Sequence, residues 1–182
     1  VHATFGDNVR GANNNASGVA ALLRIGERLV EESLSSTDVW LVAVGNSYGS
    51  QDGIRRALVS IPQEVSETYV LSVQGVGSGS LYYLQREGML QPQVYRSELI
   101  ALAMAHGERY GVTAGVYRGF PTLGFLPNMR GYATLSVMGL EGRVEPAYAW
   151  SCDDRHTEID SDSIERAGDF TFGLVRALDS LG

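Results

Sequence analysis

Residues 11–18, Gly-Ala-Asn-Asn-Asn-Ala-Ser-Gly, place three asparagines and a serine in a glycine-flanked turn directly before an apolar-periodic segment. Gly11 and Gly18 permit tight backbone geometry, and the hydroxyl of Ser17 is the expected N-cap of the following helix. Amide oxygens carry no charge, so this turn can accept hydrogen bonds but cannot offset the charge of a bound metal ion.

Histidines and carboxylates near the two ends of the chain supply the other candidate metal ligands. His2 lies in His-Ala-Thr, and His156 lies in Arg-His-Thr-Glu-Ile-Asp, which ends at Asp160. The acidic residues 153, 154, 160 and 162 could form an oxygen-ligand cation site, but they lack the glycine and the terminal glutamate of a calcium loop. We therefore expect a solvated acidic loop there.

The 11–18 turn resembles the G-A-x-D-N-A-S-G turn of the co-catalytic zinc aminopeptidase family. That family contains aminopeptidase S, aminopeptidase Y, glutaminyl cyclase and the non-peptidase relatives transferrin receptor and nicastrin. The resemblance implies that Asn14 stands where the family has an aspartate that bridges two zinc ions. It also implies that His2 matches the first zinc ligand, while Thr4 replaces the aspartate that orients that ligand.

Three further landmarks follow in the family's order. The segment 38–53 resembles a strand followed by G-x-E-E-x-G-x-x-G, with Ser47 and Tyr48 in place of the general base and a zinc-binding glutamate. Segment 69–79 resembles the N-L-D-x-V-G strand end, with Gln74 in place of the ligand aspartate. His156 matches the terminal histidine ligand of H-T-x-x-D.

The resemblance implies a zinc site that has lost its carboxylates and holds at best two imidazoles, His2 and His156. A catalytic zinc normally has about three protein ligands and a water molecule, and metal-assisted hydrolysis needs a base for that water. We therefore expect no cofactor and a catalytically inactive domain with a role in protein binding or assembly. The alternatives are a weak single-metal hydrolase, using both histidines with Asp7, Asp153 or Asp160, and a structural subunit of a homopolymer.

Alternating strand and helix patterns predict an α/β fold: a three-layer sandwich whose mostly parallel, mixed sheet is covered by helices on both faces. The expected strands lie near 39–44, 69–74, 113–117 and 133–138. The expected helices lie near 17–33, 51–59, 94–109 and 162–180. Residues 119–131 are expected to form a loop, and Tyr82 and Tyr83 are expected in loops or at sheet edges.

Composition favours a single domain over residues 1–182, because 44% hydrophobic residues suffice for one sizeable core. The formal net charge of −7 and the lack of a basic cluster argue against a nucleic-acid partner. No apolar run is long enough to span a bilayer. The single cysteine, Cys152, excludes an internal disulfide and is expected to be a buried structural thiol.

The chain starts at Val1-His2, within what the resemblance makes a central strand. We expect an aminopeptidase-like domain that lacks the family's N-terminal strands and leaves one sheet edge unpaired. Self-association as a homo-oligomer, or a protein partner that completes the sheet, would cover such an edge. An extracellular or cell-surface location is the expectation that accompanies the resemblance.

Overall fold

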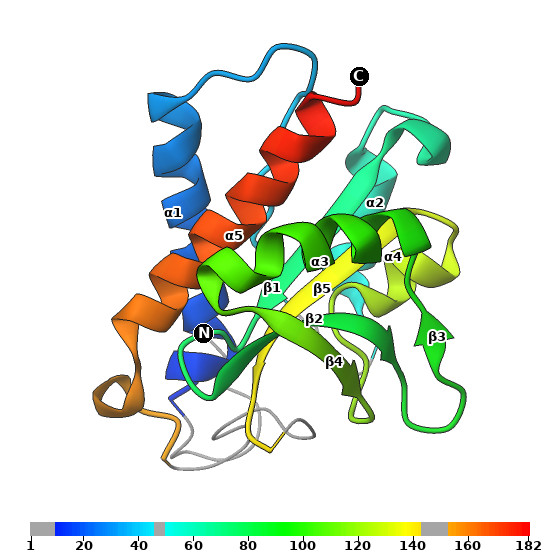
Figure 1. Ribbon diagram of the computed structural model, residues 1–182. Helices are drawn as coiled ribbons and strands as arrows, with labels where there is room; N and C mark the ends of the chain where they lie inside the picture. The colour runs from blue at the N-terminus through cyan, green and yellow to red at the C-terminus, as the bar shows by residue number, and fades with distance from the viewer. Residues whose placement is uncertain (1–9, 46–49, 143–152) are drawn as a thin grey trace.

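The computed structural model describes residues 10–45, 50–142 and 153–182. Its centre is a five-stranded mixed sheet in the order β1-β5-β2-β3, with β4 also paired to β2 (Figure 1). The strands are β1 (Tyr69–Gln74), β2 (Ser80–Glu87), β3 (Gln93–Val94), β4 (Thr113–Tyr117) and β5 (Ala133–Leu140).

The sheet contains both parallel and antiparallel strand pairs. β1 runs parallel to β5, from Tyr69 opposite Ala133 to Gln74 opposite Met138. β2 is parallel to β4 and antiparallel to both β5 and β3. The predicted strands at 69–74, 113–117 and 133–138 are thus confirmed.

Helices cover both faces of the sheet (Figure 1). α1 (Gly18–Glu31), α3 (Ser97–Tyr110) and α5 (Ser161–Asp179) pack on one face, and α2 (Asp52–Ser60) and α4 (Phe125–Met129) lie on the other. The three-layer α/β prediction and its four helices are therefore confirmed, with boundaries shifted by a few residues. The prediction of a loop at residues 119–131 is wrong in part, because α4 forms within this stretch.

Two hydrophobic clusters hold the layers together. The larger one, between the sheet and α1, α3 and α5, includes the fully buried Leu84, Leu135 and Phe170. The rings of Phe170 and Tyr83 stack with their centroids 6.5 Å apart. A smaller cluster on the opposite face joins Ile54 of α2 to residues of the sheet and α4. Burial of these side chains is the main favourable contribution to folding.

The predicted strand at 39–44 is wrong. These residues are extended but unpaired, and Trp40, Leu41 and Val42 have exposed fractions of 54%, 43% and 40%. Their β-branched and apolar character favours a strand, yet a strand also needs a neighbouring chain within hydrogen-bonding distance. Within the described residues, β1 is an edge strand and this segment is not hydrogen-bonded to it.

β2 was not predicted, and the expected loop position of Tyr82 and Tyr83 is wrong. Both tyrosines lie in β2 and are less than a tenth exposed. β2 is an internal strand of the sheet, and strands buried on both faces show a continuous apolar run without the alternation that marks a strand with one wet face. Among the residues in view, no helix has the length and apolar character required to cross a membrane.

Candidate functional site

The 11–18 turn is held by hydrogen bonds within the turn and to other segments. Gly11 adopts a left-handed conformation with φ of 67°, and Asn13 and Asn14 are buried. Ser17 does not cap α1 through its side chain, which corrects the prediction. Its hydroxyl instead donates to the backbone oxygen of Asn13 at 2.6 Å.

Side chains of this turn bind the loop that follows β1. The backbone N–H groups of residues 75, 76 and 77 donate in succession to Asn15 Oδ1, Ser17 Oγ and Asn13 Oδ1, at 3.0, 3.0 and 2.8 Å. The structure therefore brings the turn that carries Asn14 against the strand end that carries Gln74. Two positions matched by the resemblance are thus parts of one region.

A third segment joins the same region through Asp154. Its carboxylate accepts the backbone N–H of Asn13 and, at 3.2 Å, that of Asn14. Asp154 is 1% exposed, so the expectation of a solvated acidic loop is wrong at this residue. Both carboxylate oxygens orient the turn, and the sequence offered no local signal of this because Asn13 and Asn14 lie 141 and 140 residues from Asp154 in the chain.

The other described carboxylates of this loop have structural partners as well. Asp160 is the N-cap of α5, where its side chain accepts the N–H of Asp162 at 3.0 Å. Asp153 lies 3.5 Å from the guanidinium of Arg155. His156 is exposed, in the short turn His156–Glu158. Across the described ranges, no group of three or more histidine, cysteine, aspartate or glutamate side chains is arranged to hold a metal ion.

Gln74 faces the loop before α4. Its side-chain oxygen accepts the backbone N–H of Leu123 at 3.0 Å, and Gln51 donates from its amide to the backbone oxygen of Thr122 at 2.9 Å. Gln74 and Asn14 are 7% and 6% exposed and carry no charge. These two amides do not suit a pair of zinc ions, which needs anionic ligands to offset the repulsion between the ions.

Several predicted site positions cannot be related to this geometry. His2, Ser47, Tyr48 and Cys152 lie outside the described residues. The expected residual pair of His2 and His156 therefore stays a prediction. So does the single-metal alternative, since its Asp7 is also outside the described ranges.

A buried polar cluster around the carboxylate of Glu87 was not predicted from the sequence. The carboxylate of Glu87, at the end of β2, accepts hydrogen bonds from the hydroxyls of Tyr95 and Thr122 and from the backbone N–H of Thr122. Ser136 Oγ lies 2.7 Å from the Tyr95 hydroxyl and 3.0 Å from that of Thr122. The one available signal was a glutamate at the end of a largely apolar segment.

Burial favours the uncharged forms of Glu87 and Tyr95 in this cluster. Burial raises the pKa of Glu87 above its ordinary value, against the lowering effect of the hydrogen bonds from Tyr95 and Thr122. The pKa of Tyr95 is well above its ordinary value, first because of burial and then because of the negative charge of Glu87. The cluster joins β2, β5, the connection between β3 and α3, and the loop before α4, and so supports the wall that contacts Gln74.

Comparisons with solved structures identify the fold. No family model and no curated protein matches the chain. An aminopeptidase from Aneurinibacillus sp. strain AM-1 superposes with a TM-score of 0.76 at 18% identity, over 96% of this chain and 41% of that one. The zinc aminopeptidase BSAP from Bacillus subtilis gives 0.70 at 16% identity, over 95% and 43%.

A glutaminyl cyclase from an Acidobacteriales bacterium is also similar, with a TM-score of 0.52 at 14% identity over 76% of this chain and 50% of that one. The chain therefore spans half or less of the length of the solved structures it matches. Identities this low establish the architecture alone. The chain has the α/β fold shared by these two aminopeptidases and the glutaminyl cyclase.

Proposed function

We propose that this chain is a catalytically inactive, zinc-aminopeptidase-like domain whose role is protein binding or assembly. The observation that carries the proposal is the pair of buried neutral amides, Asn14 and Gln74, in the turn and strand end where the resemblance implies zinc-binding carboxylates. Without those charges, the repulsion between two dications a few ångströms apart is not compensated.

Two further features support the proposal that the domain is catalytically inactive. A carboxylate that contacts the turn, that of Asp154, accepts backbone N–H groups with both of its oxygens. The resemblance places Ser47 where the family has its general base, and a serine hydroxyl has too high a pKa to take a proton from metal-bound water without a partner base. Retention of the scaffold around such a site favours a role that uses the surface of the fold.

Metal content is the first measurement that tests this proposal. We expect elemental mass spectrometry of protein purified without chelator to find no stoichiometric zinc, and equilibration with zinc followed by gel filtration to leave none bound. A chromogenic aminoacyl anilide should not be hydrolysed faster than in buffer. About two zinc ions per chain, as a co-catalytic site requires, would overturn the proposal.

A His156→Ala variant tests the single-metal alternative and distinguishes a specific zinc site from nonspecifically bound zinc. If one zinc ion per chain is found and disappears in this variant, the single-metal hydrolase replaces our proposal. The matched control is His106→Ala, because His106 lies on α3, far along the chain from every landmark of the resemblance. Zinc lost equally from both variants would show nonspecific imidazole binding and would leave the proposal standing.

A further inference from the structure

A surface rich in arginine and in exposed apolar side chains surrounds β3, at the right-hand edge of the molecule in Figure 1. It is formed by the exposed side chains of residues 86–96 and 118–131, and we call it the β3 surface. The only acidic residue within these two ranges is Glu87, which is buried. The exposed part of the β3 surface is therefore basic, although the chain has a net charge of −7.

Hydrogen bonds hold the segments of the β3 surface together. The N–H of Gly88 donates to the backbone oxygen of Tyr117 at 3.0 Å, which joins the loop between β2 and β3 to the end of β4. The side-chain amide of Asn128 donates to the backbone oxygen of Val94 at 3.1 Å, which joins α4 to β3. Segments far apart in the chain thus adjoin one another here.

Large apolar side chains project from this surface. Leu90, in the loop between β2 and β3, is 91% exposed. Four others are each more than half exposed: Met89 beside it, Val94 of β3, Phe120 before α4 and Met129 at the end of α4. Single exposed apolar residues are ordinary on protein surfaces. A group of them on adjoining segments indicates an interaction site.

Exposed arginines accompany these apolar side chains. They are Arg86 near the end of β2, Arg96 before α3, Arg118 after β4 and Arg130 after α4. Within the described ranges none of the four forms an ion pair. Arg96 donates one N–H to the backbone oxygen of Gly131 at 3.2 Å, which leaves further donors on its guanidinium. The β3 surface thus offers several uncompensated positive charges.

The arginines of α1 and α5 differ, because carboxylates neutralise them. Arg24, Arg28 and Arg176 lie 3.0, 2.7 and 2.9 Å from carboxylate oxygens. α1 lies on the side of the molecule opposite β3 (Figure 1). The Debye length is about 8 Å at physiological ionic strength, so the local charge at β3, and not the net charge of the chain, governs what binds there.

We propose that the β3 surface docks on a lipid bilayer that contains anionic headgroups. The arginines contact headgroup phosphates, and Met89, Leu90 and Phe120 enter the boundary between headgroups and acyl chains. Arginine suits this role because its guanidinium binds phosphate oxygens through two parallel hydrogen bonds. This inference goes beyond the proposed function and does not depend on the loss of zinc.

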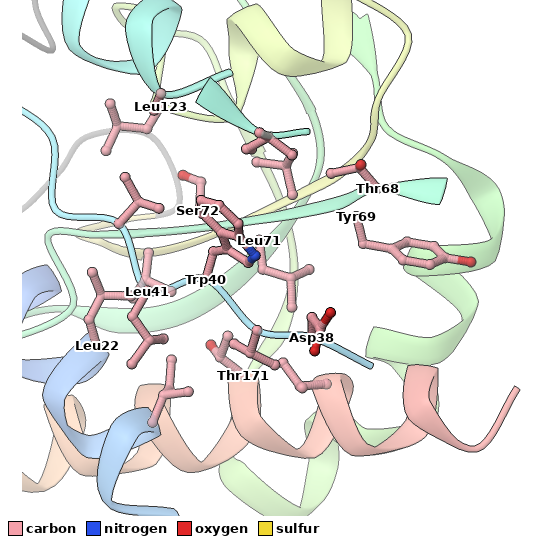
Figure 2. A pocket seen from close by; sticks show the side chains of 18 of the residues that line it. Leu22, Asp38, Trp40, Leu41, Thr68, Tyr69, Leu71, Ser72, Leu123 and Thr171 are labelled. Carbon is pink, nitrogen blue, oxygen red and sulfur yellow. The ribbon is translucent and has the colours of Figure 1, made fainter. Parts of the chain in front are cut away.

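The shape of the β3 surface favours a bilayer over a ligand in a cavity. A pocket of about 540 Å³ lies between β1 and segment 38–44, and its lining includes none of the residues of this surface that carry the proposal (Figure 2). Leu90 projects from a loop instead. A bilayer adapts to a projecting loop, whereas a folded protein partner must offer a hollow that matches it.

A second copy of the chain is a poorer occupant. Its most exposed acidic side chains on α1 are those of Glu27 and Glu31. They already lie 3.3 and 2.6 Å from the guanidinium groups of Arg24 and Arg28. Headgroup phosphates need not be released from an existing ion pair before they bind the arginines of the β3 surface.

Co-sedimentation of the intact protein with vesicles tests the inference. The probes are vesicles of equal parts phosphatidylglycerol and phosphatidylcholine, and vesicles of phosphatidylcholine alone. We expect saturable binding to the anionic vesicles and about tenfold weaker binding, or less, to the neutral ones. Binding should weaken in about 1 M salt, where the Debye length falls to about 3 Å. Inorganic phosphate at the concentration of the lipid should not displace the protein, because it offers no apolar phase.

Matched variants locate the contact. Arg118→Gln and Arg130→Gln should each weaken binding about fivefold, whereas Arg166→Gln on α5 should not. Leu90→Ser should weaken it about tenfold. Its control is Leu23→Ser, at an exposed position of α1. Circular dichroism should show all variants folded, since the replaced side chains are exposed.

Three results would overturn the inference. The first is no saturable binding to the anionic vesicles. The second is an equal loss of binding in the control variants, or none in Leu90→Ser, which would show that the β3 surface does not enter the bilayer. The third is a dimer in sedimentation that Arg118→Gln dissociates, which would make a second copy the occupant. Zinc content is measured separately, so each result leaves the test of the inactive site intact.

Discussion

The side-chain oxygen of Gln74 lies 3.0 Å from the backbone nitrogen of Leu123 and accepts its hydrogen bond. This contact joins the end of β1 to the loop before α4, on the side of the sheet opposite α1 and α5. A neutral amide thus holds a loop by a hydrogen bond at the position where the resemblance implies a metal ligand. Its replacement by the ligand residue has a cost that can be measured.

Replacing Gln74 by aspartate should destabilise the protein. Aspartate is one methylene shorter, so the N–H of Leu123 loses its acceptor and a buried carboxylate remains without a cationic partner. We expect the free energy of unfolding in urea to fall by about 1–3 kcal/mol. The control, Gln91→Asp at an exposed position, should change it by less than about 0.5 kcal/mol. Equal effects of the two variants would contradict this account.

The sequence was informative wherever the signal was local. Helix periodicity located α1, α2, α3 and α5, and apolar β-branched runs located β1, β4 and β5. The same local signal placed a strand at 39–44, where the structure has an unpaired segment. Strand formation there depends on a distant hydrogen-bonding partner, which no local pattern reports.

In the candidate site, too, some features could be predicted from the sequence and others depend on contacts between distant segments. The resemblance assigned the 11–18 turn and the end of β1 to one site, and in the structure hydrogen bonds from residues 75–77 join these two segments. Asp154 and Glu87 were not identified as buried residues, because burial of a carboxylate depends on what the fold packs around it. An aspartate in an acidic run has the local appearance of a solvated side chain whether or not it holds a turn in place.

Replacing Asp154 by asparagine should loosen the 11–18 turn. One of its two acceptor oxygens becomes an NH₂ group that faces a backbone N–H of Asn13 or Asn14, and that donor is left unsatisfied. We expect the free energy of unfolding to fall by about 1–3 kcal/mol and amide exchange in residues 12–18 to accelerate.

The neighbouring Asp153 is the matched control for this variant. Its side chain is 60% exposed and lies 3.5 Å from Arg155. Such exposed pairs contribute roughly 0–1 kcal/mol. Asp153→Asn should therefore have a small effect on stability and none on exchange in the turn. Comparable acceleration in both variants would show that the loop charge, and not the two hydrogen bonds of Asp154, orders the turn.

Replacing Gly18 by alanine should be strongly unfavourable although the residue lies in a helix. A Cβ atom there would lie 2.6 Å from the backbone oxygen of Val73 and would also meet the side chain of Asn15. Because the backbone of β1 cannot move without disturbing the sheet, we expect a loss of about 2 kcal/mol or more in the free energy of unfolding.

Gly173 on α5 provides the opposite case. A Cβ atom there would meet its nearest neighbour, the Tyr110 hydroxyl, at 3.5 Å, which is an ordinary contact. Gly173→Ala should therefore stabilise the protein by roughly 0.5–1 kcal/mol, because alanine has the better helix propensity. If Gly18→Ala were equally stabilising in thermal unfolding, the close approach between the turn and β1 would be wrong.

Because of Glu87, the free energy of unfolding should decrease as pH rises from acidic values. Burial raises its pKa in the folded state above the ordinary glutamate value that it has when unfolded. Below the ordinary value both states hold the proton and the contribution of Glu87 is complete. Between the two pKa values the unfolded chain releases its proton first, so the free energy of unfolding decreases with pH. Above the folded-state pKa the loss is constant.

A Glu87→Gln variant isolates this effect, because it keeps the shape of the side chain and removes the titration. Asp179 acts in the opposite direction, since hydrogen bonds from Ser35 and Ser36 lower its pKa, but it is present in both proteins and cancels in the difference. We expect the stability of the variant relative to the unmodified protein to increase as pH rises through this window, as measured by urea unfolding at a series of pH values. Parallel curves for Glu87→Gln and the unmodified protein would show that the hydrogen bonds from Tyr95 and Thr122 offset the burial of the charge.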